Sequence, residues 1–210
     1  MRAAIVILVL AAVAPAVAAG QQPASTVARA VGDLEASLLK KIAASPAEPS
    51  AYLELASLQI EFEAFADAEA TLLRARQALP ANKDVALKLA TVYGRREQFE
   101  KAMAILDGVA QRDPSDAEIQ QMMAAWYHEK ASKDKTLATA QRLTYVGKGI
   151  DATNRALAIR PDYIDALVYK GILLKLRAEL TTDPAERTRS AAEADALLKR
   201  ARELREKKSG

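Results

Sequence analysis

The sequence contains no cysteine and only one histidine, His128, among its 210 residues. Without cysteine the chain cannot form disulfide bonds, thiolate metal sites or a lipid-modified cysteine anchor. With a single histidine it cannot build a multi-histidine metal site or a serine-type triad with a spare base. We expect His128 on the exposed part of a long helix. We predict that the protein is not an enzyme and has no catalytic, cofactor-binding or metal-binding residues.

Aromatic residues, glycine and proline are also scarce. Aromatic side chains make up 5% of the chain, and there are eight glycines and eight prolines. Alanine and leucine supply most of the apolar surface, and alanine, leucine, glutamate, lysine and arginine are all strong helix formers. This composition favours helix and disfavours a β-sandwich or a disordered chain. The net charge of +3 gives little reason to expect nucleic acid as a partner.

The amino-terminal residues have the composition of an export signal. Residues 1–19 have a short positive end, an apolar stretch and an A-x-A cleavage site at 16–18. We therefore predict a signal peptide at 1–19 and a polar leader at 20–24, and expect an exported protein in the periplasm or outside the cell. The alternative is an uncleaved amino-terminal anchor, although Pro15 interrupts an apolar stretch of about 17 residues, the lower limit for a spanning helix. No later segment is comparably apolar, so membrane contact is expected to be peripheral at most.

Prolines mark an internal repeat. Pro46, Pro80 and Pro114 are spaced by 34 residues, and a fixed period of this length indicates a repeat architecture. Apolar residues recur with the same period, first as Tyr52, Leu55, Ala56, Phe65, Ala68 and Leu72, and then as Ala86, Leu89, Ala90, Phe99, Ala102 and Leu106. Steps of three and four residues place each half-set on one face of a helix. Each period therefore predicts two helices, the second of which ends before a proline.

In residue type, spacing and period, the two blocks between residues 49 and 114 resemble the tetratricopeptide repeat family. The resemblance implies an all-α fold, a right-handed superhelical array of antiparallel helix pairs that forms a tetratricopeptide-like α-solenoid. Stacked helix pairs of this kind have a concave face, which in the family is lined by the first helix of each pair. An unrelated array of helical hairpins is the alternative, and it would fold in much the same way.

The remaining chain fits the same plan with insertions. The predicted segments are a capping helix or half repeat at 25–45, repeats at 49–82 and 83–116, an elongated helix pair at 117–161 and an elongated terminal pair at 162–208. The insertion is visible as a gap of 47 residues between Pro114 and Pro161. We expect Ser115 to cap the helix that follows it. Lys170 occupies a position where the family has a large apolar residue, so the packing register of the last pair stays open.

Two short motifs have both a functional and a structural interpretation. The segment 147–149, Gly-Lys-Gly, is similar to the edge of a phosphate loop, but it lacks the preceding glycine and the serine or threonine that follows the lysine. We favour close helix packing as the role of these glycines. Trp126 and Tyr127 could form an adaptable partner surface or fill the interior between longer helices. We favour the interior.

The resemblance implies a partner groove on the first helices. Carried over position by position, the candidate groove consists of Leu53, Ser57, Ile60, Asp84, Leu87, Thr91, Arg95, Gln121, Ala125, His128, Val168, Ile172 and Lys175. Some family members hold the terminal carboxylate of a partner in a clamp of lysine and asparagine. That clamp is not assembled here, because its positions hold Leu53, Ser57, Lys88 and Gln121. The mixed apolar and polar groove suits an extended or helical peptide with apolar anchors.

The sequence therefore predicts an exported scaffold that binds a protein or peptide partner, with a role in assembling an envelope or secretion complex. Two alternatives stay open. The first is a structural homo-oligomer with Trp126 and Tyr127 at the interface between copies. The second is a carrier that holds a small apolar ligand between the long helices.

Overall fold

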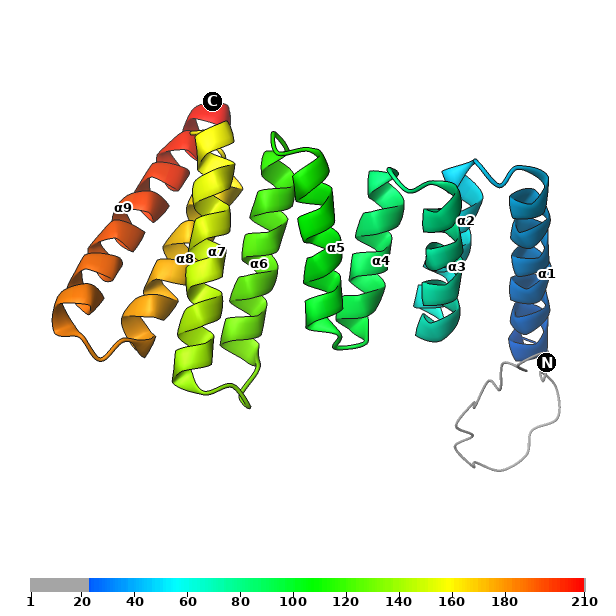
Figure 1. The fold of residues 1–210 in the computed structure, drawn as a ribbon, viewed down its shortest axis with the longest axis horizontal. Helices are drawn as coiled ribbons and strands as arrows, with labels where there is room; N and C mark the ends of the chain where they lie inside the picture. Colours follow the sequence, from blue (N-terminus) through cyan, green and yellow to red (C-terminus); the bar gives the residue numbers. More distant parts are fainter. Residues whose placement is uncertain (1–22, 210) are drawn as a thin grey trace.

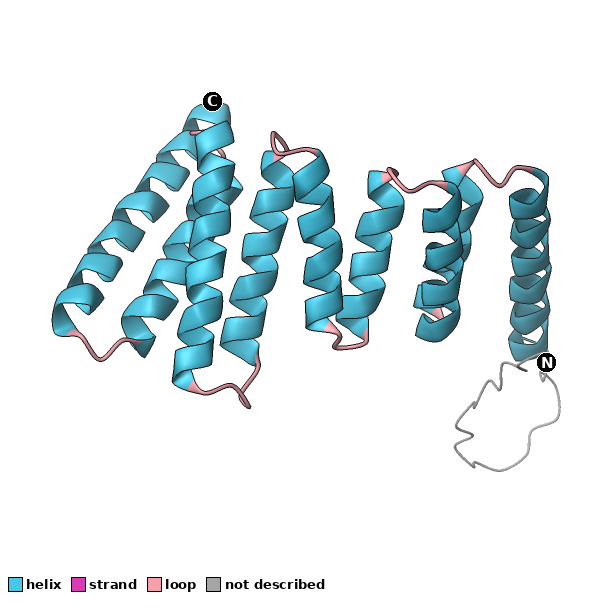
Figure 2. Cartoon of the chain, viewed as in Figure 1, coloured by secondary structure: helices cyan, strands magenta, loops and turns pink. Residues whose placement is uncertain are grey.

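The computed structural model describes residues 23–209, and the predicted signal peptide at 1–19 lies outside this range. The described residues form nine helices and no strand: α1 (Pro23–Ala44), α2 (Pro49–Glu61), α3 (Phe65–Ala78), α4 (Lys83–Arg95), α5 (Phe99–Arg112), α6 (Ala117–Lys133), α7 (Thr139–Ile159), α8 (Ile164–Leu180) and α9 (Pro184–Ser209). Consecutive helices run antiparallel and follow one another along the molecule (Figure 1; Figure 2). The predicted all-α solenoid of antiparallel helix pairs is therefore confirmed. Because α1 begins at Pro23, it also includes the last two residues of the predicted polar leader.

The periodic prolines follow the ends of the second helices. Helices α1, α3 and α5 end at Ala44, Ala78 and Arg112, each two residues before a proline, and α7 ends two residues before Pro161. Proline has no backbone N–H to donate, and it disfavours helical geometry in the residue before it. The prolines therefore set the length of the second helices and the positions of the turns between pairs.

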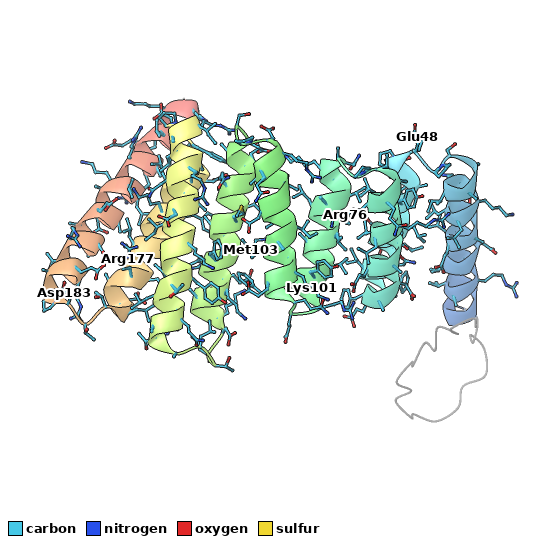
Figure 3. The ribbon with its side chains drawn as sticks, in the orientation of Figure 1. Glu48, Arg76, Lys101, Met103, Arg177 and Asp183 are labelled. Carbon is cyan, nitrogen blue, oxygen red and sulfur yellow. The ribbon has the colours of Figure 1, made fainter. Side chains whose placement is uncertain are left out.

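Small residues hold the two helices of a pair close together. Ala68 on α3 and Ala102 on α5 have no exposed surface, and Leu72 and Leu106, one turn further along, are also fully buried. A methyl group allows two helix backbones to approach, while the neighbouring leucines fill the space beside the contact. Figure 3 shows the side chains along the whole row of helices, with Met103 on α5 among the labelled residues. The repeated alanine–leucine pattern thus builds one continuous core along the row of helices.

Helix α1 occupies the position of a second helix, and the residues that the structure describes contain no first helix before it. Among the described helices it contacts α2 alone. Leu38 and Ile42 are buried against α2, but Leu34 is 48% exposed. Leu34 lies 34 residues before Ala68, which is fully buried in the next pair. The amino-terminal half of α1 is therefore only partly packed.

The turn inside each regular pair has a left-handed residue. Glu63, between α2 and α3, has φ 57°, and Glu97, between α4 and α5, has φ 59°. The amide of the following residue closes the turn in each case, with Ala64 N donating to Gln59 O at 2.8 Å and Gln98 N donating to Tyr93 O at 2.9 Å. A left-handed conformation is strained for residues other than glycine. Both glutamates therefore carry a backbone cost that the rest of the turn offsets.

The later helices are longer, as predicted. Helices α2 to α5 have 13 or 14 residues, whereas α6 and α8 have 17, α7 has 21 and α9 has 26. The prediction that Ser115 caps α6 is wrong. Asp116 is the cap, and its Oδ1 accepts from Glu118 N at 3.0 Å and from Ile119 N at 3.2 Å, while Ser115 Oγ donates to Asp113. Asp116 follows Asn82, the cap of α4, by one 34-residue period.

The last helix pairs pack through glycines and an ion pair. A Cβ atom at Gly149 on α7 would lie 2.9 Å from the methyl groups of Leu173, and one at Gly171 on α8 would lie 2.8 Å from Leu198 Cγ. A Cβ atom at Gly147 would meet nothing within 4 Å, so close packing accounts for only one glycine of the 147–149 motif. Lys170 lies in the last pair, whose packing register the sequence left open, and its Nζ pairs with Glu193 on α9 at 2.9 Å.

Three aromatic rings join the regular pairs to the elongated ones. Phe99 from α5, Tyr127 from α6 and Tyr145 from α7 have ring centroids 5.4 to 6.2 Å apart. Lys130 Nζ lies 5.5 Å from the centre of the Phe99 ring, and the Tyr145 hydroxyl donates to Glu100 at 3.0 Å. Edge-to-face rings contribute beyond their buried area. This aromatic cluster confirms the interior role of Tyr127, which is 8% exposed.

We predict that Phe99→Ala lowers the free energy of unfolding by about 3 kcal/mol, because it removes the central ring of the aromatic cluster and leaves a cavity. Urea unfolding followed by circular dichroism measures the change. The matched control is Phe62→Ala, since the Phe62 side chain is 51% exposed and its removal is expected to cost less than about 1 kcal/mol. Equal losses for the two variants would contradict the role of the cluster.

We also predict that Glu63→Gly raises the free energy of unfolding by roughly 0.5–1 kcal/mol, because glycine relieves the left-handed strain and only part of this gain is lost to chain entropy. The control is Glu54→Gly on the exposed side of α2, where glycine is expected to cost about 1 kcal/mol. Chemical denaturation of both variants gives the comparison. A loss of stability in Glu63→Gly would show that its side chain matters more than its backbone.

Candidate partner-binding groove

The first helices of the two regular pairs form a cavity between them. Its volume is about 500 Å³, and its lining residues are Leu53, Ser57 and Ile60 from α2 and Asp84, Leu87, Lys88 and Thr91 from α4. Spacings of three, four and seven residues put each set on one face of its helix. Six of these seven residues belong to the groove that the sequence predicts, and Lys88 is the addition. We call this space the first cavity.

Hydrogen bonds fix the polar side chains of the first cavity. Lys88 Nζ donates to Ser57 Oγ at 2.9 Å, and Ser57 Oγ in turn donates to the carbonyl oxygen of Leu53 at 2.7 Å. Thr91 Oγ1 donates to the carbonyl oxygen of Leu87 at 3.0 Å. The lysine therefore joins α2 to α4 across the cavity, and Leu53, Ile60 and Leu87 supply its apolar surface. Such a lining gives a partner apolar contacts and few unpaired polar groups to satisfy.

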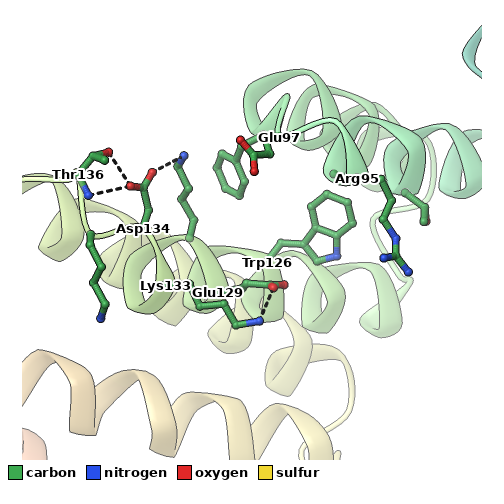
Figure 4. Close-up of a pocket in the computed structure, with 12 residues that line it drawn as sticks. Arg95, Glu97, Trp126, Glu129, Lys133, Asp134 and Thr136 are labelled. Atoms are coloured by element: carbon green, nitrogen blue, oxygen red, sulfur yellow. Dashed lines mark hydrogen bonds and ion pairs between the residues drawn. The ribbon is translucent and has the colours of Figure 1, made fainter. Parts of the chain in front are cut away.

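A second, larger cavity lies between α4 and α6. Its volume is about 840 Å³, and Figure 4 shows the side chains around it. The lining consists of Thr91, Gly94, Arg95, Glu97, Phe99, Trp126, Glu129, Lys130, Lys133, Asp134, Lys135 and Thr136. Thr91 lines both cavities, so the two spaces are neighbours along the face of α4. Of the predicted groove residues, this second cavity contains Thr91 and Arg95.

The floor of the second cavity depends on a glycine. A Cβ atom at Gly94 would lie 2.9 Å from Trp126 Cη2 and 3.2 Å from Cζ3, so the six-membered ring of the indole rests directly on the backbone of α4. Trp126 is half-buried, which places it at the cavity surface and not fully in the interior. Sequence reasoning missed this contact, although one signal was present. Ile60 and Val92 hold the positions one period before Gly94 and Trp126. A glycine thus takes the place of an isoleucine and a tryptophan that of a valine. This change in side-chain size indicates that the junction of α4 with α6 differs from that of α2 with α4.

The other six predicted groove residues line neither cavity. They are Gln121, Ala125, His128, Val168, Ile172 and Lys175. Helices α6 and α8 contact each other directly, and His128 is half-buried with its ring 6.3 Å from that of Tyr169. The expectation of an exposed His128 is therefore wrong, and burial lowers the pKa of its imidazole. Lys175 pairs with Asp195 on α9 at 3.3 Å.

Asp134 organises the loop between α6 and α7 at the far wall of the second cavity. The hydrogen bond from Lys130 is the main reason that the pKa of Asp134 falls from 3.8 to about 2. Thr136 adds two further bonds to the same carboxylate, from its hydroxyl at 2.6 Å and from its amide at 3.0 Å. The carboxylate therefore holds the loop while it is ionised, and this contribution is lost as the pH falls from 3.8 through about 2.

Two further properties bear on the class of site. Between residues 23 and 209, no group of three or more histidine, aspartate and glutamate side chains is placed to hold a metal ion. None of the helices in this range is both long and apolar enough to cross a membrane. The geometry of the described residues is that of open grooves on the first helices.

The sequence of the central pairs matches a known repeat family. Residues 74–125 match the family described as Tetratricopeptide repeat. This segment contains all of α4 and α5, together with the end of α3 and the first part of α6. It therefore includes the α4 residues that line both cavities. No curated protein sequence is significantly similar to the chain.

Solved structures with the same fold extend the likeness over most of the chain. A crystal structure of MamA superposes with a TM-score of 0.60 at 18% identity, covering 86% of this chain and 94% of MamA. MamA 41-end from Desulfovibrio magneticus RS-1 gives 0.58 at 14% identity, with 86% and 91% covered. A tetratricopeptide repeat protein from Parabacteroides merdae ATCC 43184 gives 0.57 at 18% identity, with 86% and 68% covered. The protein therefore has the fold of a tetratricopeptide-like α-solenoid.

We predict that Lys130→Met raises the pKa of Asp134 from about 2 toward 3.8, because it removes the main hydrogen bond to the carboxylate while the bonds from Thr136 remain. Titration of the side-chain carboxyl carbon by NMR measures the shift. The control is Lys133→Met, since Lys133 pairs with Glu129. An unchanged pKa of Asp134 in Lys130→Met would contradict the assigned cause.

Proposed function

We propose that the protein is an exported, non-enzymatic scaffold that binds a segment of another protein in the groove on α2, α4 and α6. The observation that carries this proposal is the first cavity, in which Leu53, Ile60 and Leu87 from two successive first helices face a common open space. The tetratricopeptide-like fold supports a protein partner. The composition of residues 1–19 supports export to the periplasm or beyond, where the scaffold would help to assemble an envelope or secretion complex.

The chemistry of the first cavity favours apolar anchors over a terminal carboxylate. Lys88, the cation that could hold a carboxylate, already donates to Ser57 at 2.9 Å. Asp84 adds a negative charge to the lining, which would repel a second carboxylate nearby. Leucine and isoleucine side chains that are partly buried give an apolar partner residue something to cover. A helical or extended segment with apolar side chains on one face meets these requirements.

We predict that Leu53→Asp and Leu87→Asp each reduce capture of the partner at least about tenfold, because a partner residue would have to desolvate a carboxylate in the first cavity. The measurement is affinity capture by the mature chain from its own envelope fraction, with quantitative mass spectrometry of the retained proteins. The matched control is Leu73→Asp, an exposed leucine of α3 that lines neither cavity.

A partner consistent with the proposal is retained by the wild-type chain and by Leu73→Asp and lost from both groove variants. Retention by all four chains would overturn the groove as the binding surface. Circular dichroism shows that the variants are folded, and light scattering of the mature chain tests the alternative of a structural homo-oligomer.

We predict that the protein recovered from the envelope fraction begins after residue 18 or 19, because the small residues there form the cleavage site. Amino-terminal sequencing measures this directly. A recovered protein that still begins with Met1 would contradict cleavage and favour the uncleaved anchor.

A further inference from the structure

The second cavity differs in chemistry from the first, although the two are adjacent. At the junction of α2 with α4 the period places Ile60 and Val92, two aliphatic residues, and Val92 is fully buried. At the junction of α4 with α6 the same positions hold Gly94 and Trp126. The glycine leaves room for the indole, and α6 continues past the usual length of a first helix. This junction therefore opens into a cavity with an aromatic floor.

The charged residues of the second cavity are only partly neutralised from within. Lys130 pairs with Asp134 at 2.8 Å, and Lys133 pairs with Glu129 at 2.7 Å. Lys135 Nζ donates to the carbonyl oxygen of Ser132 and has no carboxylate partner within residues 23–209. Two further side chains of the lining, those of Arg95 and Glu97, have no hydrogen-bond or ion-pair partner in the described chain. Two cations and one carboxylate therefore remain, and the excess charge is positive.

Arg95 and Trp126 together have the chemistry of an anchor site. Both line the second cavity, and Figure 4 shows the guanidinium group of Arg95 beside the indole, with Glu97 on the other side of the ring in this view. A half-buried tryptophan offers a rigid apolar face that loses little entropy on contact. A guanidinium group matches a carboxylate through two parallel hydrogen bonds. The pair thus suits an apolar side chain with a carboxylate next to it.

We infer that the second cavity is a specificity subsite of the partner groove, which takes an apolar side chain against Trp126 and an adjacent carboxylate on Arg95. This inference rests on the proposed function, and it adds that the partner segment is acidic as well as apolar at this end. The partner is a protein segment because Thr91 lines both cavities, so a chain that fills the first cavity can continue into the second. A small free anion is the competing occupant.

Trp126 is the only tryptophan of the chain, so its fluorescence reports on the second cavity directly. The probes are two blocked peptides, acetyl-Ala-Leu-Glu-Leu-Ala-amide and the same peptide with glutamine in place of glutamate. We expect both to change the emission, with the glutamate peptide binding about threefold more tightly at low ionic strength, as for an exposed ion pair. Sodium chloride at high concentration should remove the difference by screening.

Two variants separate the parts of the subsite. Arg95→Gln is expected to abolish the preference for the glutamate peptide while both peptides still bind. Gly94→Ala is expected to weaken both peptides several-fold, because its Cβ atom displaces the indole. The matched control is Arg74→Gln on α3, an exposed arginine outside both cavities, which should leave binding and preference unchanged.

Several outcomes would overturn the inference. The first is that neither peptide changes the fluorescence emission of Trp126. The second is equal affinity for the two peptides at low salt. The third is that the Arg95→Gln variant still prefers the glutamate peptide. Sodium acetate that matches the effect of the glutamate peptide at equal concentration would identify a site for small anions instead. If Leu87→Asp abolishes partner capture while the peptides show no preference, the groove stands and the subsite fails. If the peptides behave as expected but Leu87→Asp leaves partner capture unchanged, the second cavity binds acidic apolar peptides as inferred, while the first cavity fails as the partner surface.

Discussion

The geometry of this molecule depends on the close approach of neighbouring helices at the methyl groups of buried alanines. Ala68 and Ala102 let the two helices of each regular pair touch along their backbones, with no surface left exposed at either alanine. Any larger side chain at these points would push the helices apart. In a repeat array each pair contacts mainly its neighbours, so a change within one pair alters the angle to the next. The spacing of α2, α4 and α6, and with it the width of both cavities, depends on these contacts.

The second half of the chain also relies on small residues where helices meet, but it does not continue the groove. Gly149 and Gly171 allow the longer helices to pack closely, as the alanines do in the regular pairs. The aromatic cluster packs α5, α6 and α7 against one another. Helices α6 and α8 are in direct contact, and neither of the two cavities is lined by residues of α8. The extra length of α6 instead becomes a wall of the second cavity. The elongated pairs therefore shape the end of the groove and do not extend it.

Sequence reasoning succeeded where the period holds and failed where side chains meet across helices. The proline spacing predicts the helix pairs, and the register within one helix places Leu53 and Leu87 on the inner face. The cap of α6 could also have been predicted, because Asp116 follows Asn82 by one period. By contrast, the contact between Gly94 and Trp126 and the half-buried position of His128 depend on the angle between helices. That angle is set by the packing of side chains between helices, which the residue pattern of one helix does not specify.

The incomplete packing of α1 has a thermodynamic consequence. Among the described helices α1 contacts only α2, so it has one described interface to break, and its Leu34 is already 48% exposed. Helix α1 therefore opens at a free energy well below that of global unfolding. Because α2 to α6 do not need α1 to form the cavities, such opening leaves the groove intact. A change of length at α1 is therefore expected to leave the binding surface unaffected.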